Sequence, residues 1–186
     1  TTISSNTAAG AMANEGGGGI FNAGGTISVE GSTISENTAT GAAGSGGGIL
    51  NDLGTLTVLN TEISGNTSVR AGGGIEDNSA EGNTLTLTEV TLSNNTTASA
   101  PGNGGGLHIT GPGNSMISGG TVTENSATLE GGGLWNGSGL MTVVNTTISS
   151  NTAAGAMANE GGGGIFNAGG TISIEGSTIS ENTATG

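Results

Sequence analysis

The sequence predicts an all-β fold: a right-handed, single-stranded parallel β-helix (a three-sided β-solenoid) of about six coils of about 29 residues each. Three observations lead to this fold class. A Gly-Gly-Gly-Ile/Leu motif recurs along the chain, an Ile/Leu/Val-Ser/Thr-x-Asn motif recurs in step with it, and the segment between them alternates apolar and polar residues. A fixed period of this length is typical of solenoids, and alternation with a period of two is typical of β-strands.

The longest repeat joins the two ends of the chain. Residues 1–41 recur as residues 146–186, which is 145 positions later, with the single change of Val29 to Ile174. The 145-residue block holds five of the shorter units, so we expect residues 1–186 to form one β-solenoid domain that is part of a longer array. No segment resembles a cap, and we expect the stack to continue in both directions.

The first strand of each unit is expected at the end of the Gly-Gly-Gly run. An apolar residue follows each run, at spacings from 26 to 32 residues. We expect these residues to point inward and to stack into a ladder, because equivalent strands of successive coils pair with each other. The ladder consists of Ile20, Ile49, Ile75, Leu107, Leu134 and Ile165. The next residue of each unit is expected to point outward, in a row made of Phe21, Leu50, Glu76, His108, Trp135 and Phe166.

The second strand is predicted by strict alternation, as in Thr26-Ile27-Ser28-Val29. β-Branched residues with a period of two favour a strand that has one buried face. Two further inward ladders follow from this pattern. They are Ile27, Leu56, Leu85, Met141 and Ile172, and then Val29, Val58, Leu87, Ile117, Val143 and Ile174.

The third strand carries the second motif, in which an Asn follows three positions after the apolar residue. The expected inward ladder is Ile34, Ile63, Leu92, Val122, Ile148 and Ile179. The asparagines are Asn37, Asn66, Asn95, Asn125, Asn151 and Asn182, and both series begin one unit earlier with Ile3 and Asn6. Stacked Asn side chains form amide ladders along a β-stack, so we expect these residues to be structural.

Other roles for asparagine stay open at this point. A second series, Asn22, Asn51, Asn136 and Asn167, lies two positions after the first ladder and is interrupted by Asp77 and Ile109. N-glycosylation is the alternative to a structural role, because several asparagines head acceptor triplets. These are Asn66, Asn94, Asn95, Asn136 and Asn145.

Charge and composition exclude several classes of partner. The net charge is −13, with Arg70 as the only Lys or Arg, which argues against nucleic acid and anionic membranes as partners. The absence of Cys removes disulfides and thiolate metal sites, and no apolar stretch approaches the roughly 20 residues of a membrane helix. We therefore expect no membrane insertion by this segment.

The sequence offers no catalytic, cofactor-binding or metal-binding constellation. Arg70 is the only strong base, and Glu76 and Asp77 lie on a different segment of the following unit. Asp52 and Asp77 occupy different positions in neighbouring units, so they are not the paired carboxylates of a hydrolase. His108 is the only His and is expected on the outer surface. We expect the protein not to be an enzyme.

The pairing of Gly-Gly-Gly-Ile with Ile-Ser-x-Asn-Thr-Ala, seen at 17–20 and 34–39, resembles the repeats of bacterial polymorphic outer-membrane-type and pectate-lyase-like β-helix surface proteins. The resemblance covers the whole chain. It implies a right-handed parallel β-helix that is exported to the cell surface. The near-identical 145-residue duplication departs from that family and suggests a more regular, filament-like array.

We therefore expect a structural or adhesive module of an extracellular bacterial filament or surface stalk. Its first partner would be itself, by axial stacking or covalent continuation, with glycans or cell surfaces as further partners. One alternative is a Thr-face binding module for ice or glycan, because Thr and Ser recur at the outward positions of the second and third strands. Asn114, Met116 and Leu140 interrupt one of these arrays and Glu62 the other. A degenerate carbohydrate-active β-helix is the remaining alternative.

Overall fold

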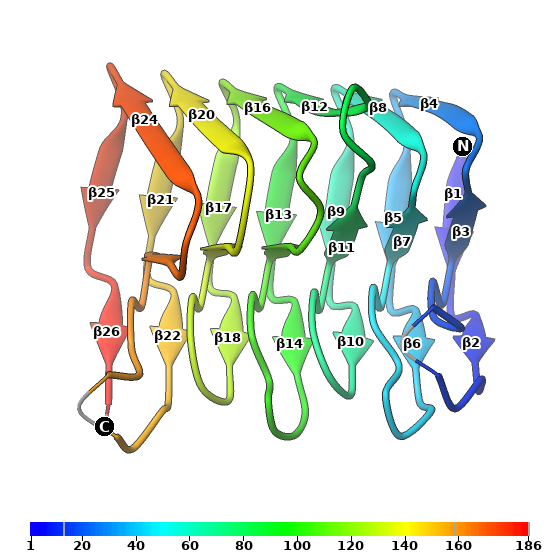
Figure 1. Cartoon of the computed structure of the whole chain (residues 1–186), viewed down its shortest axis with the longest axis horizontal. Coiled ribbons are helices and arrows are strands. Elements are labelled where there is room, and N and C mark those ends of the chain that lie inside the picture. The colour runs from blue at the N-terminus through cyan, green and yellow to red at the C-terminus, as the bar shows by residue number, and fades with distance from the viewer. Residues whose placement is uncertain (13, 158, 186) are drawn as a thin grey trace.

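The computed structural model describes residues 1–12, 14–157 and 159–185, and these form a parallel β-solenoid of about six coils that contains no helix (Figure 1). The coils follow one another along the long axis of the molecule, from the blue N-terminal end to the red C-terminal end. Residues about 29 positions apart in the sequence therefore lie side by side on neighbouring coils. The predicted parallel stack of coils is confirmed.

Each coil contains four short strands. In the second coil these are β7 (Ile49–Asp52), β8 (Thr55–Leu59), β9 (Glu62–Ser64) and β10 (Thr67–Ser68). The sequence pattern predicted the first three and missed the fourth. A two-residue strand shows no alternation, and it is separated from β9 only by Gly65, which has a φ of 63° and turns the chain, and by Asn66.

The strands form four parallel sheets, named here in the order in which a coil visits them. Sheet 1 adds to β7 the strands β3 (Ile20–Ala23), β11 (Ile75–Asn78), β15 (Leu107–Ile109), β19 (Leu134–Asn136) and β23 (Ile165–Asn167). Sheet 2 adds to β8 the strands β4 (Thr26–Glu30), β12 (Thr84–Thr88), β16 (Asn114–Ser118), β20 (Leu140–Val144) and β24 (Thr171–Glu175).

Sheets 3 and 4 have seven strands each, because the first two strands of the chain, β1 and β2, belong to these sheets. Sheet 3 adds to β9 the strands β1 (Thr2–Ser4), β5 (Thr33–Ser35), β13 (Thr91–Ser93), β17 (Thr121–Thr123), β21 (Thr147–Ser149) and β25 (Thr178–Ser180). Sheet 4 adds to β10 the strands β2 (Thr7–Ala8), β6 (Thr38–Ala39), β14 (Thr96–Thr97), β18 (Ser126–Ala127), β22 (Thr152–Ala153) and β26 (Thr183–Ala184).

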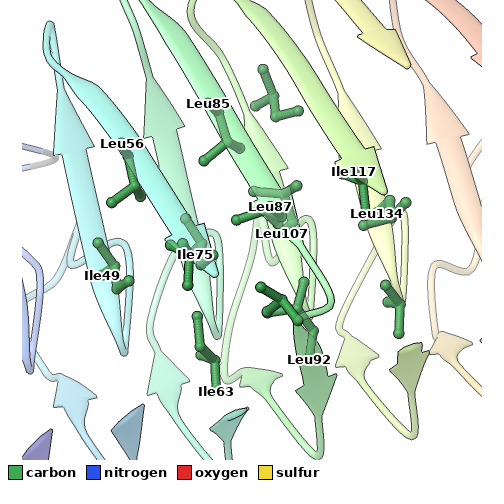
Figure 2. Packing of buried hydrophobic residues seen from close by; sticks show 14 of the residues in the cluster. Ile49, Leu56, Ile63, Ile75, Leu85, Leu87, Leu92, Leu107, Ile117 and Leu134 are labelled. Atoms are coloured by element: carbon green, nitrogen blue, oxygen red, sulfur yellow. The ribbon is translucent and has the colours of Figure 1, made fainter. Parts of the chain in front are cut away.

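The core is a column of aliphatic side chains enclosed by the sheets (Figure 2). The pairing register places each apolar residue against its equivalent, as in Ile34 against Ile63 and Ile63 against Leu92. The four ladders expected from the sequence all face this column. One ladder has an additional member, Ser115, which pairs with Leu85 on one side and Met141 on the other. Its buried hydroxyl makes no hydrogen bond within the described residues.

The Gly-Gly-Gly runs allow the backbone to turn inside the stack. Gly72 has a φ of 60°, which is unfavourable for residues with a side chain. A Cβ atom on Gly73 would overlap the carbonyl oxygen of Gly105 in the next coil and the backbone nitrogen of Thr96. Glycine is therefore required at this corner both for its conformation and for the close approach of successive coils.

Candidate functional site

The asparagines that follow the third strands form a continuous ladder. The Asn37 side-chain amide and backbone N–H both donate to Oδ1 of Asn66, each at 3.0 Å, and Asn66 repeats this with Asn95. Each amide also donates to a carbonyl of the preceding coil, as Asn66 does to Ile34 at 2.9 Å. The same contacts continue through Asn125, Asn151 and Asn182. The amides of Asn37, Asn66, Asn95, Asn125 and Asn151 are used internally, so the ladder stabilises the turn and these residues are not available to a ligand.

Burial narrows the candidates for glycosylation. Asn66, Asn95 and Asn136 are buried, whereas Asn94 and Asn145 are exposed. A glycan on any of the three buried amides would require the stack to open. Only the two exposed acceptors are compatible with modification of the folded chain.

The second asparagine series forms a shorter ladder that ends in a carboxylate. Asn22 donates to Asn51 and Asn51 donates to Asp77, each at 2.7 Å, and the Ser79 hydroxyl also donates to Asp77 at 2.6 Å. Burial raises the pKa of Asp77 to about 6, because the loss of hydration outweighs the lowering effect of these donors. On the next coil Ile109 replaces the amide, and Oδ1 of Asn136 beyond it has no hydrogen-bond partner within the described residues.

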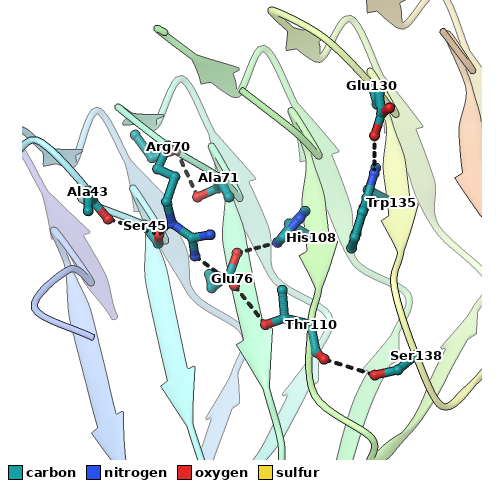
Figure 3. A network of polar contacts seen from close by, with 11 residues as sticks. Ala43, Ser45, Arg70, Ala71, Glu76, His108, Thr110, Glu130, Trp135 and Ser138 are labelled. Atoms are coloured by element: carbon teal, nitrogen blue, oxygen red, sulfur yellow. Dashed lines mark hydrogen bonds and ion pairs between the residues drawn. The ribbon is translucent and has the colours of Figure 1, made fainter. Parts of the chain in front are cut away.

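The outer row of sheet 1 departs from the sequence-based expectation. Phe21 is exposed, but Leu50, Glu76 and His108 are buried, and the prediction that His108 lies on the surface was wrong. The cause is a cluster of side chains from four coils that cover one another (Figure 3). Arg70, from the turn between β10 and β11, reaches over the sheet and its Nη2 lies 3.3 Å from Oε1 of Glu76.

Glu76 is at the centre of this cluster. Nδ1 of His108 lies 2.6 Å from Oε2 of Glu76, and the Thr110 hydroxyl donates to Oε1 at 3.0 Å. Burial by itself raises the pKa of this carboxyl, but His108, Arg70 and Thr110 outweigh that effect and leave the pKa below its usual value. Each of the two carboxylate oxygens therefore has at least one partner among the neighbouring groups.

Aromatic rings extend the cluster along the axis. The ring of His108 stacks on Trp135 with a centroid separation of 4.2 Å, and Trp135 stacks on Phe166 at 6.4 Å. The Trp135 indole N–H donates to Glu130 at 2.8 Å. Trp135 is stacked between His108 and Phe166, so its ring faces are turned toward neighbouring coils and do not form an open platform for a sugar ring.

The side-chain cluster on sheet 1 is better suited to holding neighbouring coils together than to catalysing a reaction. A small hollow beside Glu76 is lined by Asn14, Leu50, Asp52, Glu76, Asn78 and Thr110. Glu76 is buried and both of its oxygens already have partners, and Arg70 is held by Glu76 and by Ser45. Among the described residues, no three His, Asp or Glu side chains gather in a way that could hold a metal ion.

A second regular surface lies on sheet 3. Its two outward rows carry Thr or Ser in register on all seven strands, with Glu62 as the one exception. We call this surface the hydroxyl face; its first row is Thr2, Thr33, Glu62, Thr91, Thr121, Thr147 and Thr178, and its second is Ser4, Ser35, Ser64, Ser93, Thr123, Ser149 and Ser180. On sheet 2 the corresponding array is interrupted by the exposed side chains of Met116 and Leu140.

Comparisons with protein-family models, with curated proteins and with solved structures gave no match to this chain. The resemblance noted in the sequence is therefore supported only at the level of fold, as a parallel solenoid of stacked coils. No helix in the described part of the chain is long and apolar enough to cross a membrane.

Proposed function

We propose that this chain is a structural segment of an extracellular filament or surface stalk, in which stacked coils act as a stiff spacer. One observation carries the proposal: the two copies of the 41-residue sequence occupy equivalent positions on one uninterrupted stack. In sheet 3, β1 and β21 belong to the two copies and lie five strands apart. The 145-residue block therefore adds a whole number of coils, and the stack can grow by blocks without a change of register.

The surface charge suits a long rod that stays separate from its neighbours. A net charge of −13 keeps neighbouring rods apart at low ionic strength and lets them bundle when cations screen the charge. A bacterial surface protein of the β-helix type is the class that we propose. In this role the partners are further coils of the same kind, and glycans or cell surfaces at the site of attachment.

The proposal includes no catalytic role for this segment. Arg70 and His108 are both engaged with Glu76, and the two Asp side chains are not paired across a cleft. We expect no release of unsaturated products from polyuronides, with or without Ca²⁺. Product formation above background that is lost in Arg70→Ala would contradict this part of the proposal.

Electron microscopy and fibre diffraction of the native material test the structural role. Five coils at about 4.8 Å each give an axial repeat of about 24 Å. We expect filaments or stalks outside the cell, with a meridional reflection at about 4.8 Å and a longer repeat near 24 Å. Compact particles, or a filament whose repeat is unrelated to the coil spacing, would show that the chain has another function.

The hydroxyl face favours a second candidate function, the binding of an ordered water lattice such as ice. Seven in-register strands present hydroxyl groups at about 4.8 Å intervals along the axis, which is the kind of regularity that a crystalline surface requires. The replacement Glu62→Thr completes the first row and should increase inhibition of ice recrystallisation. If neither the original chain nor this variant alters ice growth, the regularity of this face has a purely structural origin.

A further inference from the structure

We infer that a hollow on the hydroxyl face is a binding site for a neutral saccharide. The site rests on the proposed function and deepens it, because it gives the glycan partner a place on the rod. The hollow has a volume of about 380 Å³ and lies over β5, β9 and β13, which are neighbours in sheet 3 (Figure 1). Each of these three strands is paired on both edges. The hollow therefore belongs to the interior of the stack and does not depend on either end of the chain.

The hollow is open because Gly65, at the corner after β9, has no side chain. The φ of Gly65 is 63°, and residues with side chains occupy the other described corners of this row with φ values of 55° to 57°. These residues are Ser5, Glu36, Asn94, Glu124, Ser150 and Glu181. A Cβ atom on Gly65 would meet no atom closer than 3.9 Å outside its chain neighbours. Unlike Gly72 and Gly73, Gly65 is therefore required neither by the backbone conformation nor by the approach of the next coil.

A second departure from the repeat lies on the same coil. Glu62 replaces Thr in the first row of the hydroxyl face, between Thr33 and Thr91. The Ser64 hydroxyl donates to Oε1 of Glu62 at 2.9 Å, which holds the carboxylate along the face toward the corner at Gly65. Gly65 thus opens the hollow and Glu62 supplies an acceptor at its edge. Stacking of the coils explains neither change, because Thr and a larger corner residue are accommodated on the neighbouring coils.

Every side chain that lines the hollow is polar. Serine hydroxyls from three successive coils and the exposed Asn94 amide offer both donors and acceptors, while Glu36 and Glu62 offer acceptors. A saccharide carries hydroxyl groups around its ring, and each of them can both donate and accept a hydrogen bond. Bonds from such hydroxyls to a carboxylate are charge-assisted and stronger than bonds between neutral groups. The lining therefore matches a ligand that is rich in hydroxyl groups.

Charge decides which saccharides fit. Glu36 and Glu62 both line the hollow, and its described lining includes no Lys, Arg or His. A carboxylate or sulfate group on the ligand would be repelled by these two side chains, so acidic sugars are disfavoured. The described lining also includes no aromatic ring on which a sugar could stack. We therefore expect weak binding, with a Kd of about 1 mM, and a preference for neutral over acidic glycans.

NMR titration of the full chain tests the site. The probes are neutral hexasaccharides of glucose, mannose and galactose, with the hexasaccharide of galacturonic acid as the acidic counterpart and EDTA in the buffer. We expect at least one neutral probe to shift the backbone N–H signals of Glu36, Gly65 and Asn94 and to leave those of sheet 1 unchanged. The acidic probe should bind about ten-fold more weakly or not at all. Unchanged spectra with all three neutral probes, or stronger binding of the acidic one, would overturn the inference.

The replacement Gly65→Asn fills the hollow with the residue that occupies the next corner, at Asn94. We expect the affinity for the neutral probe to fall by about ten-fold or more. The matched control is Gly31→Asn, because Gly31 is also an exposed corner with a positive φ of 52° and no atom near its Cβ position, but it lies outside the hollow. This variant should bind like the original chain. Equal affinities for Gly65→Asn and Gly31→Asn would contradict the site.

A second variant keeps the test valid if Gly65→Asn disturbs the fold. Glu62→Gln preserves the size of the side chain and the open hollow, and removes only the charge that strengthens the hydrogen bonds from the ligand. We expect its affinity for the neutral probe to fall by about three-fold or more. Melting temperatures of the variants report whether the stack is intact. Unchanged affinity in Glu62→Gln, with signals shifting elsewhere than at the hollow, would place binding at another surface and overturn the inference.

The saccharide site and the other proposals fail in different ways. If no neutral probe binds but native filaments with a repeat of about 24 Å exist, the structural role stands and the site is wrong. If binding depends on Gly65 but the native material forms no filament, the site is real and the structural role is wrong. The variant Glu62→Thr separates the site from ice binding, because it should weaken saccharide binding and strengthen inhibition of ice recrystallisation.

Discussion

The first and sixth coils have almost the same sequence and very different environments. The first is covered on both sides in sheets 3 and 4, where its Ile34 and Asn37 are completely buried. The sixth is covered on one side only, and the equivalent Ile179 is half exposed while Asn182 is partly exposed. Burial in this fold is therefore a consequence of stacking, and one coil cannot build a core by itself.

The largest difference in stability between the two copies is expected when a charged residue replaces an Ile of the third-strand ladder. Ile34→Asp places an unpaired carboxylate between stacked aliphatic side chains and should lower the free energy of unfolding by more than about 4 kcal/mol. Ile179→Asp puts the same charge where water can reach it and should cost less than half of that. Chemical denaturation of the two variants measures the difference, and equal losses would mean that the end coil is as well covered as the first.

The next effect concerns Asp77, the carboxylate at which the ladder of Asn22 and Asn51 ends. Its pKa is raised from the ordinary value of 3.8 to about 6 in the folded protein, so the native state holds a proton between these pH values that the unfolded state has lost. The stability of the protein relative to Asp77→Asn therefore falls as pH rises from about 4 to 6 and is constant above. The shift of about two pKa units corresponds to roughly 3 kcal/mol.

Thermal unfolding from pH 3.5 to 8 tests this expectation. The variant Asp77→Asn should gain stability over the original chain at pH 7 and approach it below pH 4. Asn167→Asp, at the equivalent position of the exposed end coil, should produce a much smaller pH dependence because water solvates the carboxylate there. A gain for Asp77→Asn that is independent of pH would show that Asp77 is not desolvated.

A smaller effect is expected for removal of a rung from the first asparagine ladder. Asn37→Ala leaves the backbone N–H of Asn6 and the carbonyl of Ile3 without their partners, and should cost about 1–3 kcal/mol. Asn182→Ala likewise leaves the backbone N–H of Asn151 and the carbonyl of Ile148 without their partners. Asn37→Ala additionally removes a donor to the buried Oδ1 of Asn66, so Asn182→Ala should cost less. Denaturant midpoints compare the two, and a larger loss for Asn182→Ala would contradict the idea that stacking on both sides stabilises the ladder.

The smallest effect is expected on the outer surface of sheet 2. Thr57 points away from the core between Ser28 and Thr86, and Thr57→Asp should change stability by no more than about 0.5 kcal/mol. Ile63→Asp, an inward change on the same coil, is the matched control and should behave like Ile34→Asp. If Thr57→Asp and Ile63→Asp lower the melting temperature equally, the assignment of inner and outer faces is wrong.

Much of the fold could be predicted because each coil repeats the same inward and outward pattern. Periodicity places Ile34, Ile63 and Leu92 in one ladder without any knowledge of the turns. The fourth strand could not be predicted, because two residues such as Thr67–Ser68 carry no period. The pairing of these residues depends on how the preceding corner turns, and that corner is occupied by Gly in one coil and by Glu, Asn or Ser in others.

The cluster on sheet 1 was missed for a different reason. Alternation assigns Glu76 and His108 correctly to the outer side of their strands, but it does not show what covers that side. The reach of Arg70 across the sheet and the stacking of Trp135 on His108 depend on side-chain conformations. One signal was present in the sequence: Glu76 and His108 hold the same position in successive units, so the register alone places an acid beside an imidazole.

The equivalence of the two copies also bears on how such a protein changes length over generations. Recombination in the coding DNA between the segments for residues 1–41 and 146–186 joins corresponding positions of two coils. The recombined chain keeps every strand, turn and ladder position in register. Each event of this kind adds or deletes five complete coils, so the folded chain tolerates it without a mismatch at the junction. The length of the rod can thus change between generations in steps of one 145-residue block.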